Sequence, residues 1–293
     1  MFDAFSYFEK LWEDHQPDLR ADLGSDGKSN GRLGRSAQAD FWNRRASSYD
    51  AHGNQTESRE HRRLLVESLA DKAGIGPDSQ VLDIGCGPGK MALVFAEKAA
   101  RVEALDIAPK MIALAEENAA EEKRPNVHFQ ALDWSEADLS ALGWEKKFQL
   151  VLASKTPAVN DRAALEKMTA ASNGYCCLIT QVDVRNSVAE QLKPLIDWDE
   201  RRARLCRSFY CAFNLLWLLG YYPEVEYFER TWIGESSLED AELMHCRYFD
   251  SIKPLTASQK KALARKLESL SQDGLIKEVG AAKAAVMFWS VRP

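Results

Sequence analysis

The chain has 293 residues and a formal net charge of −6, with 45% hydrophobic and 28% charged residues. These values are typical of a globular protein and argue against a large nucleic-acid surface, which usually needs a basic face. No apolar run reaches the roughly 18 residues of a membrane span, and the acidic, aromatic N-terminus differs from a secretion signal. We therefore expect a cytoplasmic protein with neither nucleic-acid nor membrane partners.

The N-terminal region is predicted to be helical. Apolar residues at helical spacing predict a helix over residues 2–13, and further helical segments begin near residue 40 and cover 57–72. Residues 21–37 are rich in Gly, Ser and Asn and are predicted to form a flexible segment. We expect residues 1–58 to be a helical cap or lid and residues 59–293 to be the main domain.

From residue 80 onward, short apolar strands alternate with helical segments. This pattern is typical of βαβ units, so we expect a parallel sheet with helices on both faces. The predicted strands are 81–85, 102–108, 126–134, 148–154 and 174–183. After residue 183 the pattern loosens to a helix over 199–219, a strand over 224–234, helices over 236–246 and 256–272, and a closing strand over 284–291.

A glycine-rich loop follows the first strand and reads Asp83-Ile-Gly85-Cys-Gly87-Pro-Gly89-Lys90. A dinucleotide fingerprint, GxGxxG, starting at Gly85 would need a glycine where Lys90 stands. A carboxylate such as Asp83 would also repel a pyrophosphate, whereas it can orient an ammonium group. The loop therefore favours a cationic ligand such as S-adenosylmethionine (SAM) over a dinucleotide.

Two more acidic residues stand at the ends of the second and third strands. Asp106 can accept hydrogen bonds from both hydroxyls of a ribose, which does not separate NAD from SAM. Asp133 can accept the amino group of an adenine, with Ile107 and Met111 on the faces of the ring. Helix capping by Asp133 and core packing by its neighbour Trp134 are the alternative interpretations.

The segments VLDIGCGPG, ALDIAPKMIALAEENA, NVHFQALDW and FQLVLAS resemble the successive motifs of class I SAM-dependent methyltransferases. FWNRRASSYD resembles the helix that precedes these motifs in the small-molecule type. The resemblance covers about residues 40–183. It implies a doubly wound α/β fold with a seven-stranded, mostly parallel sheet of order 3-2-1-4-5-7-6, the last strand antiparallel. Separately, we expect the helices at about 235–272, before the closing strand, to form a substrate-capping insertion.

The resemblance assigns roles to residues of this chain. Asp83 and the three loop glycines would hold the methionine part of SAM, and Tyr49 would close over it. Asp106 would bind the ribose and Asp133 the adenine. The complete set of expected cofactor-binding residues is Tyr49, Asp83, Gly85, Cys86, Gly87, Gly89, Asp106, Ile107, Met111, Asp133, Trp134 and Ser154. The product would be S-adenosylhomocysteine.

The methyl acceptor is less clearly indicated. The segment from Ser154 to Asn160 lacks the [DNS]PP[YFW] motif of exocyclic-amine methylation, and no Pro-Cys pair suggests attack on a pyrimidine. We therefore expect a small-molecule acceptor. A protein or RNA target and a SAM-binding protein without catalysis remain alternatives. Lys155 can meet an acceptor carboxylate, or it is simply solvated.

A general base is needed only if the acceptor loses a proton. His52, which follows Tyr49 in the expected cap, is the first candidate, and a solvent-facing histidine is the alternative interpretation. The six cysteines include no CxxC pair, so we expect no metal site. Arsenite as an acceptor would need several thiolates, but the spacing of Cys206 and Cys211 puts them on different helix faces.

Overall fold

The computed structural model describes residues 3–14, 35–53, 56–200, 208–250 and 252–292. Residues 21–34 of the expected flexible segment lie outside these ranges, and its last residues begin a helix. Before the sheet come helices α1 (Ala4–Asp14), α2 (Arg35–Gly53) and α3 (Thr56–Ala73). Within the described residues, no helix is both long and apolar enough to cross a membrane.

The expected alternation of strands and helices follows. Its elements are β1 (Gln80–Ile84), α4 (Lys90–Phe95), β2 (Arg101–Asp106), α5 (Pro109–Glu121), β3 (Val127–Ala131), η2 (Trp134–Glu136), α6 (Leu139–Leu142), β4 (Phe148–Ser154), α7 (Arg162–Ala171) and β5 (Ser172–Asn186). The later elements are α8 (Ser187–Leu192), η3 (Lys193–Leu195), α10 (Ser208–Leu218), β6 (Glu224–Ser237), α11 (Leu238–Asp250), α12 (Ala257–Leu270) and β7 (Leu275–Ser290).

The predicted sheet is confirmed. Its order is β3-β2-β1-β4-β5-β7-β6. The pairs β1–β2, β2–β3, β1–β4 and β4–β5 are parallel, and the sheet ends in antiparallel pairing. Two ion pairs join β6 to β7, Glu229 with Lys283 and Glu235 with Lys277. Residue numbers rise along one strand as they fall along the other, as antiparallel neighbours require.

Three strands are longer than predicted. β5 extends to Asn186 rather than residue 183, β6 extends to Ser237 rather than residue 234, and β7 begins at Leu275 rather than residue 284. The first half of β7 alternates between buried and exposed side chains, so it lacks the continuous apolar run of its second half. Gly280 lies in this first half, where an added Cβ would overlap the ring of Trp232 on β6.

The chain divides into two compact units. Unit 1 contains Met1–Leu33, Gln181–Asn214 and Glu226–Ala285; unit 2 contains Gly34–Thr180, Leu215–Val225 and Val286–Pro293. This division differs from the expected boundary after residue 58, because α2 and α3 belong to the same unit as β1–β4. Unit 1 has a core of its own, built from buried apolar residues of α8, α11, α12 and β7: Val188, Ala189, Leu192, Ala241, Phe249, Leu263, Leu267 and Ile276.

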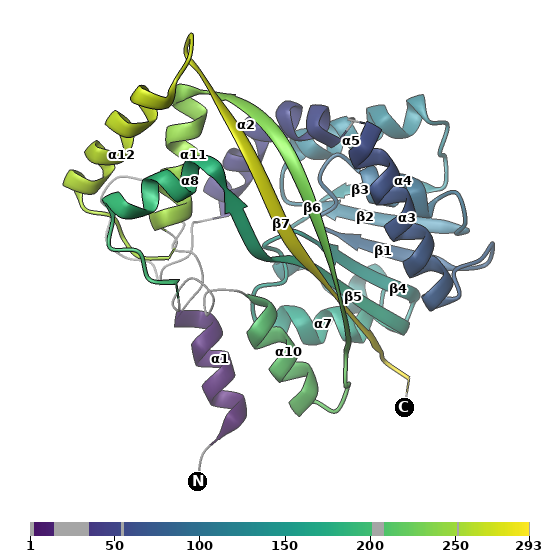
Figure 1. The fold of residues 1–293 in the computed structure, drawn as a ribbon. Coiled ribbons are helices and arrows are strands. Elements are labelled where there is room, and N and C mark those ends of the chain that lie inside the picture. The colour runs from purple at the N-terminus through teal and green to yellow at the C-terminus, as the bar shows by residue number, and fades with distance from the viewer. Residues whose placement is uncertain (1–2, 15–34, 54–55, 201–207, 251, 293) are drawn as a thin grey trace. The chain divides into compact units, whose positions relative to one another are not determined.

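Unit 2 holds the parallel part of the sheet. Leu82, Ile84, Leu105, Leu150 and Leu152 are fully buried, because helices cover both faces of these strands. Helices α4 and α5 lie on one face and α7 on the other (Figure 1). This arrangement is the doubly wound one predicted from the alternation of elements.

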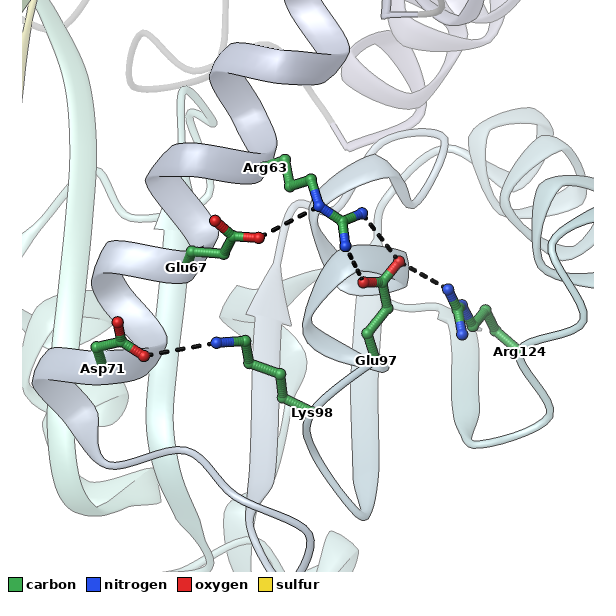
Figure 2. A network of polar contacts seen from close by, with 6 residues as sticks. All are labelled: Arg63, Glu67, Asp71, Glu97, Lys98 and Arg124. Carbon is green, nitrogen blue, oxygen red and sulfur yellow. Dashed lines mark hydrogen bonds and ion pairs between the residues drawn. The ribbon is translucent and has the colours of Figure 1, made fainter.

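A network of ion pairs joins α3 to the segments that follow α4 and α5 (Figure 2). The Glu97 carboxylate lies 2.8 Å from an Arg63 nitrogen and 2.7 Å from an Arg124 nitrogen. Arg63 also pairs with Glu67, and Lys98 with Asp71. The Glu97 carboxylate thus links the segment after α4 to α3, through Arg63, and to the segment after α5, through Arg124.

We expect Glu97→Gln to lower the melting temperature by about 1–3 °C at low ionic strength, because Arg63 and Arg124 lose their shared anion. Salt screens such pairs, so the difference from the unchanged protein should shrink in 0.5 M NaCl. Thermal unfolding at both salt concentrations measures it. Glu166→Gln, which removes only the single pair with Arg162, is the control and should have a smaller effect. An equal loss at both salt concentrations would contradict the electrostatic origin.

Candidate functional site

The parallel register brings the loops after β1, β2, β3 and β4 to one edge of the sheet. Ile84 pairs with Leu105 on one side and Ala153 on the other, and Asp106 pairs with Ala131. Because β1 lies between β2 and β4, the chain connections diverge here to the two faces of the sheet. Ligands of doubly wound folds bind at such switch points.

The glycine loop (residues 85–89) is tightly packed at this point. Gly85, Gly87 and Gly89 have φ angles of +68°, +54° and +77°, which are strained for other residues. An added Cβ at Gly85 would overlap the Thr156 hydroxyl and lie 2.6 Å from Thr156 Cβ, and one at Gly89 would lie 2.9 Å from the Phe129 ring. The loop therefore contacts both the segment after β4 and strand β3.

Asp106 holds the glycine loop from the neighbouring strand. One carboxylate oxygen accepts from the Gly87 N–H at 2.9 Å, and the other accepts from the Ala108 N–H at 2.9 Å. Burial raises the pKa of Asp106, and these two hydrogen bonds oppose the rise. A carboxylate has about four acceptor sites, so two remain for hydroxyl donors.

Asp83 is buried beneath the same loop. Burial, followed by the charge of Asp106, raises the pKa of Asp83 to about 7, against the opposing effect of a hydrogen bond from the Ala92 backbone. Its Oδ2 has no hydrogen-bond partner. An unpartnered buried carboxylate oxygen is costly, and a cationic donor placed at the loop would satisfy it. Burial, Asp83 and Asp106 together also raise the pKa of the Cys86 thiol, which stays protonated.

We expect Asp83→Asn to become more stable relative to the unchanged protein as the pH rises from about 4 to about 7. The unfolded chain releases the Asp83 proton near its ordinary pKa of 3.8, but the folded protein keeps it until about 7. In this window ionisation favours the unfolded state, by about 1.4 kcal/mol per pH unit at most. Urea unfolding of both proteins between pH 4 and 8 measures the difference, and a difference that does not vary with pH would contradict the raised pKa.

Helix α2 carries the predicted Tyr49 and His52. Tyr49 is 43% exposed, and its ring contacts that of Trp42 edge to face at 5.6 Å between centroids. Ala46 of α2 packs with Ala108 and Met111 of the β2–α5 segment. His52 lies in α2, but its side chain is outside the described part of the structure.

The third strand end differs from the other two. Asp133 caps η2 by accepting from the Ser135 N–H at 2.9 Å. Trp134 is 1% exposed, and its indole N–H donates to the Ala164 carbonyl at 3.1 Å. Capping and core packing, the alternative interpretations of these residues, are therefore both seen. Their roles toward adenine stay predictions.

The remaining expected residues lie around the same edge. Ile107 and Ser154 are half-buried, and Met111 is buried near Gly87. Lys155 adopts a left-handed backbone with φ of +52°, and its N–H donates to the Ile179 carbonyl at 2.8 Å. Such a conformation in a non-glycine residue is uncommon and concentrates at functional sites.

The chain also carries other chemistry-bearing groups besides the predicted site residues. His245 is buried, with its Nε2 2.7 Å from Glu278 Oε1, inside unit 1. Cys206 is outside the described residues, and burial raises the pKa of Cys211 to about 11. Among the residues that the structure describes, no group of three or more His, Cys, Asp or Glu side chains is arranged to hold a metal ion. A cavity of about 420 Å³ lies at the outer edge of β2 and β3, beside Glu103 and His128, and none of the predicted site residues lines it.

The sequence patterns did not predict the contacts of four residues at the site. Thr156 packs under Gly85, while Asp50, Lys90 and Asn118 join α2 to the glycine loop. Lys90 was noticeable only as a departure from the dinucleotide pattern. Asn118 lies within the segment ALDIAPKMIALAEENA, but no role was predicted for it, because its partners lie on α2 and in the glycine loop.

Comparison with known proteins identifies related chains. Residues 75–212 match a methyltransferase domain family. A 23S rRNA (uracil(1939)-C(5))-methyltransferase of Shewanella sediminis is 36% identical over 88 residues, covering 30% of this chain and 20% of that protein. A malonyl-[acyl-carrier protein] O-methyltransferase of Serratia marcescens is 34% identical over 92 residues, covering 31% and 34%. The chain thus matches only a fifth to a third of the length of these two relatives.

A solved structure is similar over more of the chain. It is magnesium protoporphyrin IX methyltransferase from Synechocystis PCC 6803 with bound SAH. The match has a TM-score of 0.48 and 13% identity, and it covers 86% of this chain and 98% of that one.

Proposed function

We propose that this chain, which carries a class I SAM-dependent methyltransferase domain, transfers a methyl group from SAM to a small-molecule acceptor and releases S-adenosylhomocysteine. The observation that carries the proposal is the pair of buried carboxylates at the glycine loop. Asp83 has an oxygen without a partner, and Asp106 keeps acceptor capacity after binding two backbone N–H groups. Both features suit a ligand with an ammonium group and a ribose.

Different residues of this chain would bind different parts of the ligand. Asp83 would take the ammonium group through its unpartnered oxygen, and the loop glycines let the backbone approach the methionine part. Asp106 would accept from the ribose hydroxyls, and Tyr49 would close over the methionine end. When bound, SAM supplies an electrophilic methyl group on its sulfonium. The protein then contributes mainly position and alignment, and His52 is the proposed general base if the acceptor must lose a proton.

Sequence chemistry supports a small-molecule acceptor over RNA. The net charge of −6 does not favour a polyanion, and the chain has no Pro-Cys pair for attack on a pyrimidine ring. Lys155, at the end of β4, offers an ammonium group for an acceptor that carries a carboxylate. The α11–α12 insertion is the proposed cap over this acceptor. An acyl-carrier-protein substrate and an RNA substrate, which the relatives' names raise, are the competing proposals.

Transfer of radiolabelled methyl from SAM distinguishes these proposals. The protein is incubated with labelled SAM and three separate acceptor pools: a small-molecule extract, acylated carrier protein and total RNA. We expect label in small molecules that pass an ultrafiltration membrane and that chromatography separates from unreacted SAM. Label that nuclease releases would instead support an RNA substrate, and label bound to the carrier protein would support an acyl-carrier-protein substrate. If calorimetry shows SAM binding but no label reaches any pool, the non-catalytic alternative is favoured. The Asp106→Ala variant is the control for background label.

A further inference from the structure

A partly buried polar cluster joins helix α2 to the glycine loop within unit 2. Lys90 Nζ lies 2.9 Å from Asp50 Oδ1, and only 11% and 19% of the two side chains are exposed. The Asn118 side-chain NH₂ donates both to Asp50 Oδ1 at 2.9 Å and to the Pro88 carbonyl at 3.0 Å. These three residues, with the Pro88 carbonyl, are called the Asp50 cluster below.

The cluster occupies a sensitive position in the chain. Asp50 directly follows Tyr49 near the end of α2, and Lys90 directly follows Gly89 at the start of α4. Asn118 lies on α5 and donates to both α2, at Asp50, and the glycine loop, at Pro88. The same cluster therefore contacts the helix that presents Tyr49 and the loop that would receive the methionine part of the cofactor.

Polar contacts matter more than usual for the placement of α2. Its sequence, RSAQADFWNRRASSYDAHG, has no apolar stripe along one face. Among the described side chains, a small apolar cluster around Ala46 and Met111 joins it to α5. A second polar contact joins Asn43 to the Lys110 N–H at 3.0 Å. A shielded ion pair with an added amide hydrogen bond is strong enough to hold the end of such a helix.

We propose that Lys90 and Asn118 are positioning residues for SAM, acting through Asp50 and the Pro88 carbonyl. They couple the Tyr49 end of α2 to the glycine loop, so that ordering either one favours the other. By linkage, SAM binding then tightens α2, and loss of the cluster weakens SAM binding by the same free energy. This inference rests on the proposed function, because it takes the loop and Tyr49 as the site of the methionine part.

Calorimetry with two ligands tests the coupling. The full chain and its variants Asp50→Asn, Lys90→Met and Asn118→Ala are titrated with SAM and with 5′-methylthioadenosine, which lacks the amino-acid part. We expect each variant to raise the Kd for SAM about tenfold and the Kd for 5′-methylthioadenosine less than about twofold. Asp50→Asn combined with Lys90→Met should not exceed the larger single effect, since both break one pair.

Two controls separate positioning from general stability. Lys98→Met breaks the ion pair with Asp71, which does not touch the glycine loop, and should leave both Kd values unchanged. Lys90→Arg keeps the charge and should restore SAM binding to within about threefold. Equal losses for the two ligands, or an unchanged Kd for SAM, would overturn the proposal. Failure of the unchanged protein to bind SAM would instead overturn the proposed function.

Hydrogen exchange gives a second readout that does not depend on activity. In the unchanged protein, SAM should slow exchange of the α2 amides over residues 43–53, because ligand binding and helix docking are linked. In Asp50→Asn at saturating SAM, this protection should be lost while β1 and β2 stay protected. Equal protection of α2 in both proteins would show that the cluster does not carry the coupling.

Discussion

Replacement of Gly85 by alanine is expected to lower the free energy of unfolding by about 3 kcal/mol or more and to abolish measurable SAM binding. Two physical effects add at this position. The φ angle of +68° strains any residue with a Cβ, and the new Cβ would overlap the Thr156 side chain. Urea unfolding and calorimetry with SAM measure the two losses.

A matched glycine separates these effects. Gly143 has a similar φ of +61°, but an added Cβ there would meet nothing within 4 Å. Gly143→Ala should therefore show only the backbone strain, about 1–2 kcal/mol, with SAM binding intact. Adding Thr156→Gly to Gly85→Ala should restore the part of stability that the clash removes. Equal destabilisation by the two alanines would show that the contact with Thr156 is unimportant.

Asp106→Ala is expected to raise the Kd for SAM at least about 100-fold. The variant removes the proposed acceptor of the ribose hydroxyls. It also frees the glycine loop, because the Gly87 N–H loses its hydrogen-bond acceptor. Hydrogen bonds to a charged group contribute about 1.5–3 kcal/mol each. The free energy of unfolding should also fall by about 2 kcal/mol, because two N–H groups lose their acceptor. Calorimetry and urea unfolding measure both effects.

Asp138 provides the control for this substitution. Its side chain also accepts from two backbone N–H groups, those of Ser140 and Ala141, but it caps α6 away from the glycine loop. Asp138→Ala should lower stability by about 1 kcal/mol and leave the affinity for SAM unchanged. An Asp106→Ala protein that binds SAM within about twofold of the unchanged protein would disprove the ribose assignment.

Much of the fold could be predicted because its signals are local. The apolar runs of β1 and β4 and the glycines at positive φ are visible in the sequence, and the family resemblance supplied the strand order. The first half of β7 was missed because its alternating pattern with Gly280 does not read as a continuous apolar strand. The grouping of α2 with the sheet was missed because this helix docks through side chains distant in sequence.

Site residues could be predicted where they lie at or near the carboxyl end of a strand. Asp83 and Asp106 belong to this class, since parallel strands deliver their ends to one edge. That Asp106 also binds the Gly87 N–H was not predictable, because it depends on the path of two loops at once. The same holds for Asn118, whose two partners lie on α2 and in the glycine loop.

The division of the chain limits how its two units can be exchanged between related proteins. The chain passes between the two units five times, after residues 33, 180, 214, 225 and 285. Strands β5, β6 and β7 each contain one of these crossings, after residues 180, 225 and 285. Neither unit is therefore one continuous stretch of sequence, and no single break point in the chain separates them. A chimera with a different unit 1 would need three simultaneous replacements, over 1–33, 181–214 and 226–285, with the strand registers kept across every junction.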